Sequence, residues 1–229
     1  MLGLIARLPE IALELLALAL AVSCHESAHG WVAERLGDPT ARRLGRISLN
    51  PARHVDLFGT IVFPVMLALM GAPIVGWAKP VPFVQRNLRD QRWGPVLVGL
   101  AGPACNLLLV VIGTALLLVF KNTRPEFQLI WQRPLTTTTM GSFGLMSVSV
   151  AWLFSFTSIN LILAVFNLIP VPPLDGSHLL EALLPARMAL PYAQLRPYGM
   201  LILFGLVWIG FFGYVLRPFL HVLYWILFA

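Results

Sequence analysis

Three residues near the start of the sequence have the types and the spacing that suit metal chemistry. His25, Glu26 and His29 form the pattern HExxH, inside an apolar stretch that runs from Ile11 to Val32. A helix turns by about 100° per residue, so residues four apart project roughly 40° from each other, and Glu26 falls on the same arc. Two imidazoles on one face can bind one metal ion, and the carboxylate can act as a base on its bound water. We interpret the three residues as two metal ligands and a catalytic base, with a solvated helix face as the alternative.

The composition places this pattern inside a membrane. Of the 229 residues, 58% are hydrophobic and only 11% are charged, against roughly 25% charged in soluble domains. Ionisable side chains are costly in a lipid-facing segment, so those found there are candidates for function. The net charge of +6 comes from Lys and Arg in short loops, which is typical of membrane topology. We therefore predict an integral membrane protein whose partner is the lipid bilayer and not a nucleic acid.

The apolar runs predict an all-α polytopic membrane protein with about four spanning helices. These runs are residues 9–36, 95–120, 144–169 and 199–216. The first helix is expected to start near Pro9, because proline suits the first helical position. The last is expected to continue past Pro218 as a kinked helix.

The remaining connections are short. A strand-like stretch suggests a short β element at 44–50. No hydrophilic connection is long enough to hold a separate domain. We therefore expect one membrane domain over 1–229, with a core at 9–185 and a C-terminal helix at 199–228.

The apolar run at 57–76 is interrupted by glycines and prolines, and the distribution of basic residues indicates whether it crosses the membrane. If it turns back, eleven of the sixteen Lys and Arg residues lie on one side; if it crosses, the split is nine to seven. The positive-inside rule favours the first arrangement. We therefore predict a broken, re-entrant hairpin at 57–76, packed against protein or water because irregular backbone is not tolerated in lipid.

A third metal ligand must come from another part of the chain, because a catalytic zinc has three protein ligands and one open position. The candidate is Asp175 in the sequence NLIPVPPLDG, where prolines end the preceding helix and Gly176 allows close backbone approach. On local grounds Asp175 fits equally well as the N-cap of a helix at 177–184. With the hairpin, two crossings separate His29 from Asp175 and return both to one side, which favours the ligand.

Several motifs carry a resemblance to a known family: HESAHG at 25–30, AGPACN at 101–106, NLIPVPPLDG at 167–176, and the segments 37–60 and 76–83. With these motifs the sequence resembles the site-2 protease family of intramembrane zinc metalloproteases. Within that family it is similar to a bacterial subgroup without a PDZ or CBS domain.

The resemblance implies a specific site and a specific activity. One Zn²⁺ ion per chain would be held by His25, His29 and Asp175, with Glu26 as the base. The substrates would be transmembrane proteins, cut near the cytoplasmic side of the bacterial cytoplasmic membrane, with the active site towards the cytoplasm.

Three further polar residues are weaker candidates. Asn167, eight residues before Asp175, is a candidate donor to the oxyanion of the reaction, or else a cap for backbone groups at a broken helix. His54, two residues from Asp56, is a support of the metal site, an alternative ligand or an interfacial histidine. Asn106 is expected to satisfy neighbouring backbone where small residues let helices pack closely.

Two other classes of protein share some of these features. A catalytically silent membrane scaffold would keep the fold, but the intact Glu26 argues against it. A metal transporter can also combine intramembrane His and Asp with a broken helix. Transport needs paths on both sides and usually internal repeats, which the sequence does not show. We therefore favour the protease; the sequence gives no indication of oligomeric state.

Overall fold

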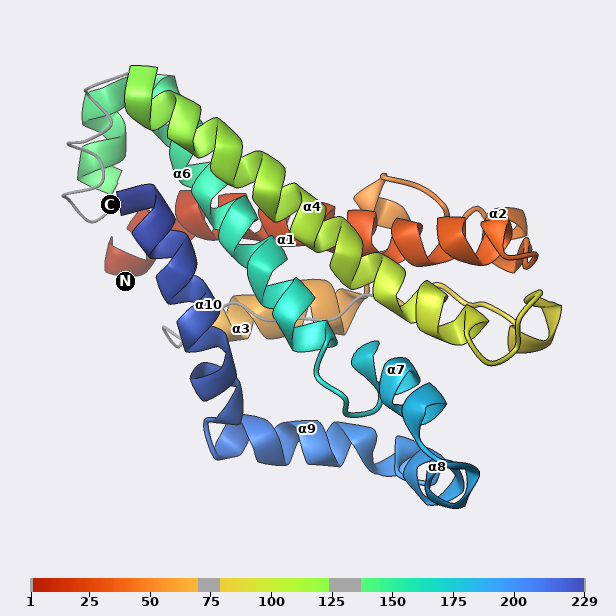
Figure 1. The fold of residues 1–229 in the computed structure, drawn as a ribbon. Helices are drawn as coiled ribbons and strands as arrows, with labels where there is room; N and C mark the ends of the chain where they lie inside the picture. The colour runs from red at the N-terminus through yellow and green to blue at the C-terminus, as the bar shows by residue number, and fades with distance from the viewer. Residues whose placement is uncertain (1, 70–78, 124–136, 229) are drawn as a thin grey trace.

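The protein is a bundle of helices. The computed structural model describes residues 2–69, 79–123 and 137–228, and within these ranges it contains helices and no strand (Figure 1). The longer helices are α1 (Leu2–Arg35), α4 (Gly94–Thr123), α6 (Thr137–Asn167) and α10 (Phe211–Phe228). The shorter ones are α2 (Thr40–Arg43), α3 (Phe63–Leu69), α7 (Gly176–Leu183), α8 (Ala186–Ala193) and α9 (Gly199–Trp208). A π-helical turn, Leu57–Val62, leads into α3, and 3-10 turns lie at Pro51–Arg53, Gln85–Asn87 and Arg196–Tyr198.

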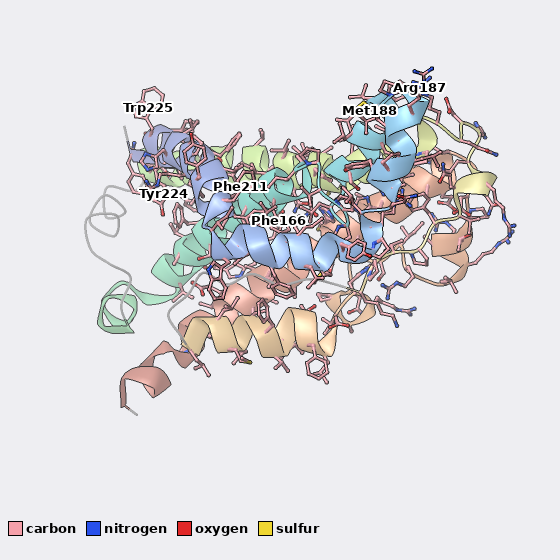
Figure 2. The ribbon with its side chains drawn as sticks, turned by 90° about the horizontal axis from the view of Figure 1, so that it is seen from below. Phe166, Arg187, Met188, Phe211, Tyr224 and Trp225 are labelled. Atoms are coloured by element: carbon pink, nitrogen blue, oxygen red, sulfur yellow. The ribbon has the colours of Figure 1, made fainter. Side chains whose placement is uncertain are left out.

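Four of the described helices are long and apolar enough to cross a membrane. The segments are Ile11–Arg35, Gly94–Thr123, Val148–Asn167 and Phe211–Phe228. Large apolar side chains also lie on the outside of the bundle: Trp225, which is 71% exposed, projects from the end of α10 away from the other helices (Figure 2). Such a surface is unfavourable in water and suits lipid. The predicted four-helix, all-α membrane architecture is confirmed.

The core lies where α1, α4 and α6 pack against one another. On one side, Leu18 and Val22 of α1 contact Leu163 of α6. On the other, Leu117 of α4 packs with α6 residues and with Leu223 of α10. Helix α6 therefore joins the histidine-bearing helix to the rest of the bundle.

The predicted start of the first helix is wrong. Helix α1 begins at Leu2, and Pro9 lies inside it. The proline ring fixes a φ angle that suits a helix, and the missing N–H removes one backbone hydrogen bond. This loss destabilises the helix but does not have to end it. The end before Gly37 is as expected.

The predicted β element at 44–50 is also wrong, because residues 46–50 have no regular secondary structure. Side chains bind the backbone groups that a strand would need. Ser27 Oγ lies 2.6 Å from Ser48 O and 3.2 Å from Ser48 N, and His54 Nε2 donates to the same carbonyl at 2.7 Å. The segment is thus fastened to α1 by Ser27 instead of pairing with another strand.

The predicted C-terminal helix at 199–228 is two helices. Gly210 separates α9 from α10 with a φ of 73°, a left-handed conformation that glycine adopts without strain. Helix α9 therefore ends after Trp208, and the spanning segment is Phe211–Phe228 and not 199–216. Pro218 lies within α10.

The residues that flank the apolar run at 57–76 lie next to each other. Lys79 N donates to His54 O at 3.0 Å, and the Arg46 side chain donates to Arg53 O and Lys79 O, so the two ends of the run are held together. Residues 57–69 are helical, whereas the turn of the predicted hairpin lies outside the described residues. Figure 1 also shows α2, the segment before α4, and α8 towards one end of the molecule. These contacts support the re-entrant arrangement.

Accessibility labelling tests this topology. We expect Arg43→Cys and Arg89→Cys, both at exposed positions, to react with a membrane-impermeant maleimide from the same side of the membrane. Asn122→Cys, at the other end of α4, should react from the opposite side. The assay compares intact and permeabilised spheroplasts in a chain whose Cys24 and Cys105 are replaced by alanine. Labelling of positions 43 and 89 from different sides would contradict the hairpin.

Candidate metal centre

The two histidines of the HExxH pattern lie one turn apart on α1 and face the same way. Their ring centroids are 4.6 Å apart, with the ring planes at 82°. Both side chains are buried, His25 at 6% and His29 at 8% exposure. The helical period thus brings the two Nε2 atoms to one side of α1, as the spacing predicts.

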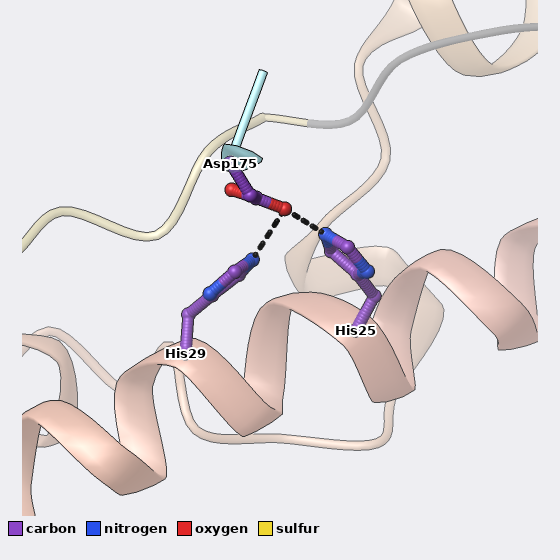
Figure 3. Close-up of side chains that lie close together, drawn as sticks. All are labelled: His25, His29 and Asp175. Carbon is purple, nitrogen blue, oxygen red and sulfur yellow. Dashed lines mark ion pairs between the residues drawn. The ribbon is translucent and has the colours of Figure 1, made fainter. Parts of the chain in front are cut away.

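Asp175 lies directly over these histidines (Figure 3). Its Oδ2 atom is 3.1 Å from His25 Nε2 and 3.4 Å from His29 Nε2. The ligand atoms of the three residues all lie within 4.8 Å of one another, and no other such group of three or more His, Cys, Asp or Glu residues occurs in the described parts of the chain. The structure therefore brings together two nitrogen donors and one oxygen donor from segments far apart in sequence.

Asp175 does not act as a helix cap. It stands at the N-cap position of α7, but its side chain accepts no capping hydrogen bond, and its φ and ψ of −59° and −36° are helical. A capping residue has extended backbone angles, which aim its side chain at the first turn of its own helix. The Asp175 side chain instead points back towards α1.

The turn after α6 brings Asp175 to this place. The Val171 and Leu174 amides donate to Ile169 O and Val171 O, which curls the proline-rich segment between α6 and α7. Gly176 then passes so close to Leu168 that a Cβ atom would lie 2.3 Å from Leu168 O. A residue with a side chain would push the turn apart and move Asp175 away from the histidines.

The other ring nitrogen of each histidine is already engaged. His29 Nδ1 lies 2.7 Å from Val98 O, which as a carbonyl can only accept a hydrogen bond. His25 Nδ1 lies 2.5 Å from Asn106 Oδ1. In a neutral imidazole with its proton on Nδ1, Nε2 carries a lone pair. Two nitrogen lone pairs therefore face Asp175 Oδ2. This oxygen is buried and accepts no hydrogen bond from the described residues. Three acceptors that face one another are stabilised by a cation between them, and these donor types fit zinc.

One stripe of α4 covers the site. Val98, Gly102 and Asn106 are spaced by four residues, so they lie along one face of that helix. Val98 and Asn106 bind the two histidines, while a Cβ on Gly102 would lie 2.4 Å from His29 Nε2 and 2.6 Å from His25 Nε2. The motif AGPACN thus supplies an acceptor and the space that lets the α4 backbone lie against the ligand atoms.

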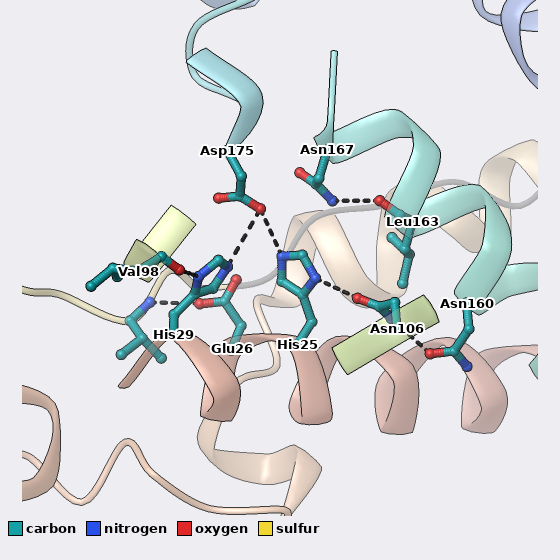
Figure 4. A network of polar contacts seen from close by, with 10 residues as sticks. His25, Glu26, His29, Val98, Asn106, Asn160, Leu163, Asn167 and Asp175 are labelled. Atoms are coloured by element: carbon teal, nitrogen blue, oxygen red, sulfur yellow. Dashed lines mark hydrogen bonds and ion pairs between the residues drawn. The ribbon is translucent and has the colours of Figure 1, made fainter. Parts of the chain in front are cut away.

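Glu26 lies beside the three candidate ligands, half-buried, and its position is set by the segment that follows residues 57–76 (Figure 4). Val81 N donates to Glu26 Oε2 at 2.7 Å. Among the described residues, no hydrogen bond is formed to Oε1. One carboxylate oxygen is therefore held in place, and the other can meet a reactant.

The weaker candidates lie around this centre and not in it. Asn167 is at the end of α6 near Asp175, and its Nδ2 donates at 3.0 Å to Leu163 O, a backbone carbonyl one turn earlier in the same helix (Figure 4). Asn106 binds a histidine side chain and not the backbone. Asn160 of α6 donates to Phe156 O and accepts from Asn106 Nδ2.

His54 lies in the loop fastened to α1 and outside the group of ligands. Burial lowers the pKa of its imidazole, so the ring is neutral, and Nε2 donates to Ser48 O. The nearby Asp56 side chain accepts from Phe58 N and Gly59 N at the start of the π-helical turn. His54 and Asp56 therefore do not form a pair, and each orders its own part of the loop.

The contacts that sequence reasoning misses are those of backbone atoms. Val98 O and Val81 N orient His29 and Glu26, and no side-chain type reveals them. Asn106 and Asn160 leave a weak signal, because buried polar residues in membrane helices indicate function or interhelical contacts.

Similarity to known proteins agrees with this geometry. The sequence profile of peptidase family M50 matches residues 13–210. This chain belongs to peptidase family M50. A Bacillus subtilis protein named "Putative zinc metalloprotease YwhC" is 35% identical to this chain over 204 residues. The matched region covers 89% of this chain and 84% of the relative. A Mycolicibacterium smegmatis protein named "Putative zinc metalloprotease Rip2" is 26% identical over 183 residues. That match covers 80% of this chain and 61% of the relative. No solved structure matches the chain.

Family and geometry together define the class of enzyme. The M50 protein is a zinc metalloprotease and an integral membrane protein. Zinc is its cofactor, and the group formed by His25, His29 and Asp175 fits that ion. The family membership predicted from the sequence motifs is confirmed.

The close approach of α4 can be tested by adding one methyl group. We expect Gly102→Ala to displace the histidine Nε2 atoms and to weaken zinc binding on the order of tenfold or more, as loss of ligand orientation does. Gly205→Ala is the matched control, because a Cβ there meets nothing within 4 Å. Zinc affinity is measured by competition with a chelator on the detergent-purified protein. Equal affinities for both variants would show that α4 does not press on the site.

Proposed function

We propose that this chain is an intramembrane zinc protease that cleaves transmembrane proteins near the cytoplasmic face of the bacterial cytoplasmic membrane. In this proposal His25, His29 and Asp175 hold one zinc ion, Glu26 is the base, and Asn167 supports the oxyanion. The whole chain would act as a single membrane domain. The observation that carries the proposal is the convergence of three buried electron-pair donors within 4.8 Å, with the Glu26 carboxylate at their side.

Glu26 is arranged for proton transfer. When bound, zinc would polarise the scissile carbonyl and lower the pKa of a bound water to about 7. The free Oε1 of Glu26 can take a proton from that water and pass it to the leaving amine nitrogen, while Val81 N holds Oε2. The fixed oxygen keeps the carboxylate from turning away between the two transfers.

Asn167 has a hydrogen-bond donor to spare. Its amide nitrogen carries two hydrogens, and the contact with Leu163 O uses one of them. The second is available to an oxyanion next to Asp175. The contact with Leu163 O and the catalytic role are therefore compatible, since the contact orients the amide group.

The position of the site supports the choice of substrate and side. His29 lies six residues before Arg35, the last residue of α1, so it is about 9 Å from the helix end that carries the basic loops. Basic loops face the cytoplasm in membrane proteins. A substrate helix at this depth has every backbone carbonyl hydrogen-bonded, so it must unwind locally before a peptide bond reaches the site.

Replacing the proposed base should separate chemistry from metal binding. We expect Glu26→Gln to lower cleavage by about 10²- to 10⁴-fold, because the amide cannot accept the proton, while one zinc per chain is retained. Asp175→Ala should lose the metal. The assay uses proteoliposomes holding a single-span protein with a Gly-Pro pair in the cytoplasmic third of its helix, and zinc is measured on the same samples.

Three results would contradict this assignment. Cleavage by Glu26→Gln at the wild-type rate would show that Glu26 is not the base. Full zinc content in Asp175→Ala would show that Asp175 is not a zinc ligand. Zinc flux across the proteoliposomes, without cleavage, would favour a transporter.

The oxyanion role of Asn167 predicts a kinetic effect without loss of metal. We expect Asn167→Ala to reduce kcat by about 10²- to 10³-fold, with KM and zinc content near those of the wild type. A fall in thermal stability with unchanged kcat would instead assign Asn167 to capping alone.

A further inference from the structure

A chain of buried amide groups runs from His25 into the bundle (Figure 4). Asn106 Oδ1 lies 2.5 Å from His25 Nδ1, Asn106 Nδ2 lies 2.7 Å from Asn160 Oδ1, and Asn160 Nδ2 lies 2.8 Å from Phe156 O. Both asparagines are completely buried, at 0% exposure. The chain links α1, α4 and α6 through side chains that do not touch the other two proposed ligands.

The last member of this chain sets the direction of every hydrogen bond in it. Phe156 O is a carbonyl and can only accept, so Asn160 must turn its NH₂ group towards it. Asn160 Oδ1 then faces Asn106 and accepts from the Asn106 NH₂ group. Asn106 Oδ1 is thereby turned to His25, and Nδ1 of that ring must carry the proton.

The position of this proton decides whether His25 can bind a metal through Nε2. A neutral imidazole carries one proton, so a proton on Nδ1 leaves a lone pair on Nε2, which faces Asp175 Oδ2 at 3.1 Å. If Asn106 were reversed, its NH₂ group would favour the proton on Nε2 and block that lone pair. The reversed chain would also set two oxygen atoms against each other at Phe156, beside an asparagine that is 0% exposed.

The two histidines differ in what holds them. His29 Nδ1 donates to Val98 O, a backbone atom that no side-chain substitution removes. His25 depends on two side chains in succession. The orientation of His25 is therefore sensitive to α6, the helix that also leads to Asp175.

We propose that Asn160, acting through Asn106, is a positioning residue that keeps His25 protonated on Nδ1 and its Nε2 ready for zinc. This inference rests on the proposed role of His25 as a zinc ligand. Removing a group that orients a metal-binding histidine typically costs about 10- to 100-fold in metal affinity.

Zinc affinity tests the inference without measuring activity. We expect Asn160→Leu to bind zinc about 10- to 100-fold more weakly than the wild type in chelator competition on the purified full chain. Thr157→Val is the matched control: Thr157 is also fully buried on α6, three residues earlier, and its hydroxyl donates only to Leu153 O. This control should stay within about twofold of the wild type, since the Thr157 side chain donates to Leu153 O and forms no hydrogen bond with Asn106, Asn160 or Phe156 O.

A second pair of variants leaves α6 unchanged. Asn106→Asp keeps an acceptor for His25 Nδ1 whichever way its side chain turns, although its second oxygen loses the hydrogen bond to Asn160 Oδ1; it should therefore bind zinc more tightly than Asn106→Leu. Asn106→Leu removes the acceptor and should lose affinity as Asn160→Leu does. In ¹⁵N-histidine spectra of the zinc-free proteins, the wild type and Asn106→Asp should show one more histidine with a proton on Nδ1 than Asn106→Leu shows.

The outcomes separate this inference from the proposed function. Zinc affinity of Asn160→Leu equal to that of Thr157→Val would overturn it, as would equal losses in Asn106→Asp and Asn106→Leu. His25→Ala serves as the reference. If His25→Ala keeps full zinc affinity, the proposed ligand set fails; if it loses zinc while Asn160→Leu does not, only the positioning role fails.

Discussion

Three electron-pair donors that face one another inside an apolar bundle are the constraint on which the rest of this structure depends. Without a cation, His25 Nε2, His29 Nε2 and Asp175 Oδ2 would repel one another in a medium that screens charge poorly. The fold keeps them converged by binding the far side of each imidazole and by curling the chain tightly before Asp175. A zinc ion held by these three atoms, as proposed, would turn this costly arrangement into a favourable one.

Helix α4 positions both histidines through residues on one of its faces. A carbonyl at Val98, a bare backbone at Gly102 and an amide at Asn106 recur every four residues and meet the two histidines in turn. Because the stripe belongs to one helix, the helical backbone fixes the spacing of its three features. The site is thus aligned by the packing of α4 on α1 and needs no flexible loop for its histidines.

The re-entrant segment connects topology to chemistry. By leaving at His54 and returning at Lys79, the chain places Val81 against α1, where its amide holds Glu26. The same return leaves two crossings between His29 and Asp175, so that both reach one side of the bundle. The proposed base and the proposed third ligand therefore depend on one feature of the fold, although they lie 149 residues apart in the sequence.

The sequence by itself determined the features that follow from local rules. Helical period places His25, Glu26 and His29 on one face, hydropathy marks four spanning helices, and the count of basic residues favours the hairpin. Local rules failed where a residue type is compatible with more than one local structure. Pro9 lies inside a helix it was expected to begin, and Gly210 divides a run that hydropathy treats as continuous, because glycine permits a left-handed turn without requiring one.

Only the tertiary structure decided what each polar group faces. Asp175 suits a helix cap and a metal ligand equally well in sequence, and only its distance to two histidines distinguishes them. The stretch around Ser48 has strand-like residues, yet Ser27 and His54 bind its backbone instead. The amide of Val81 and the carbonyl of Val98 have no signature in sequence at all, because every residue but proline carries the same backbone groups.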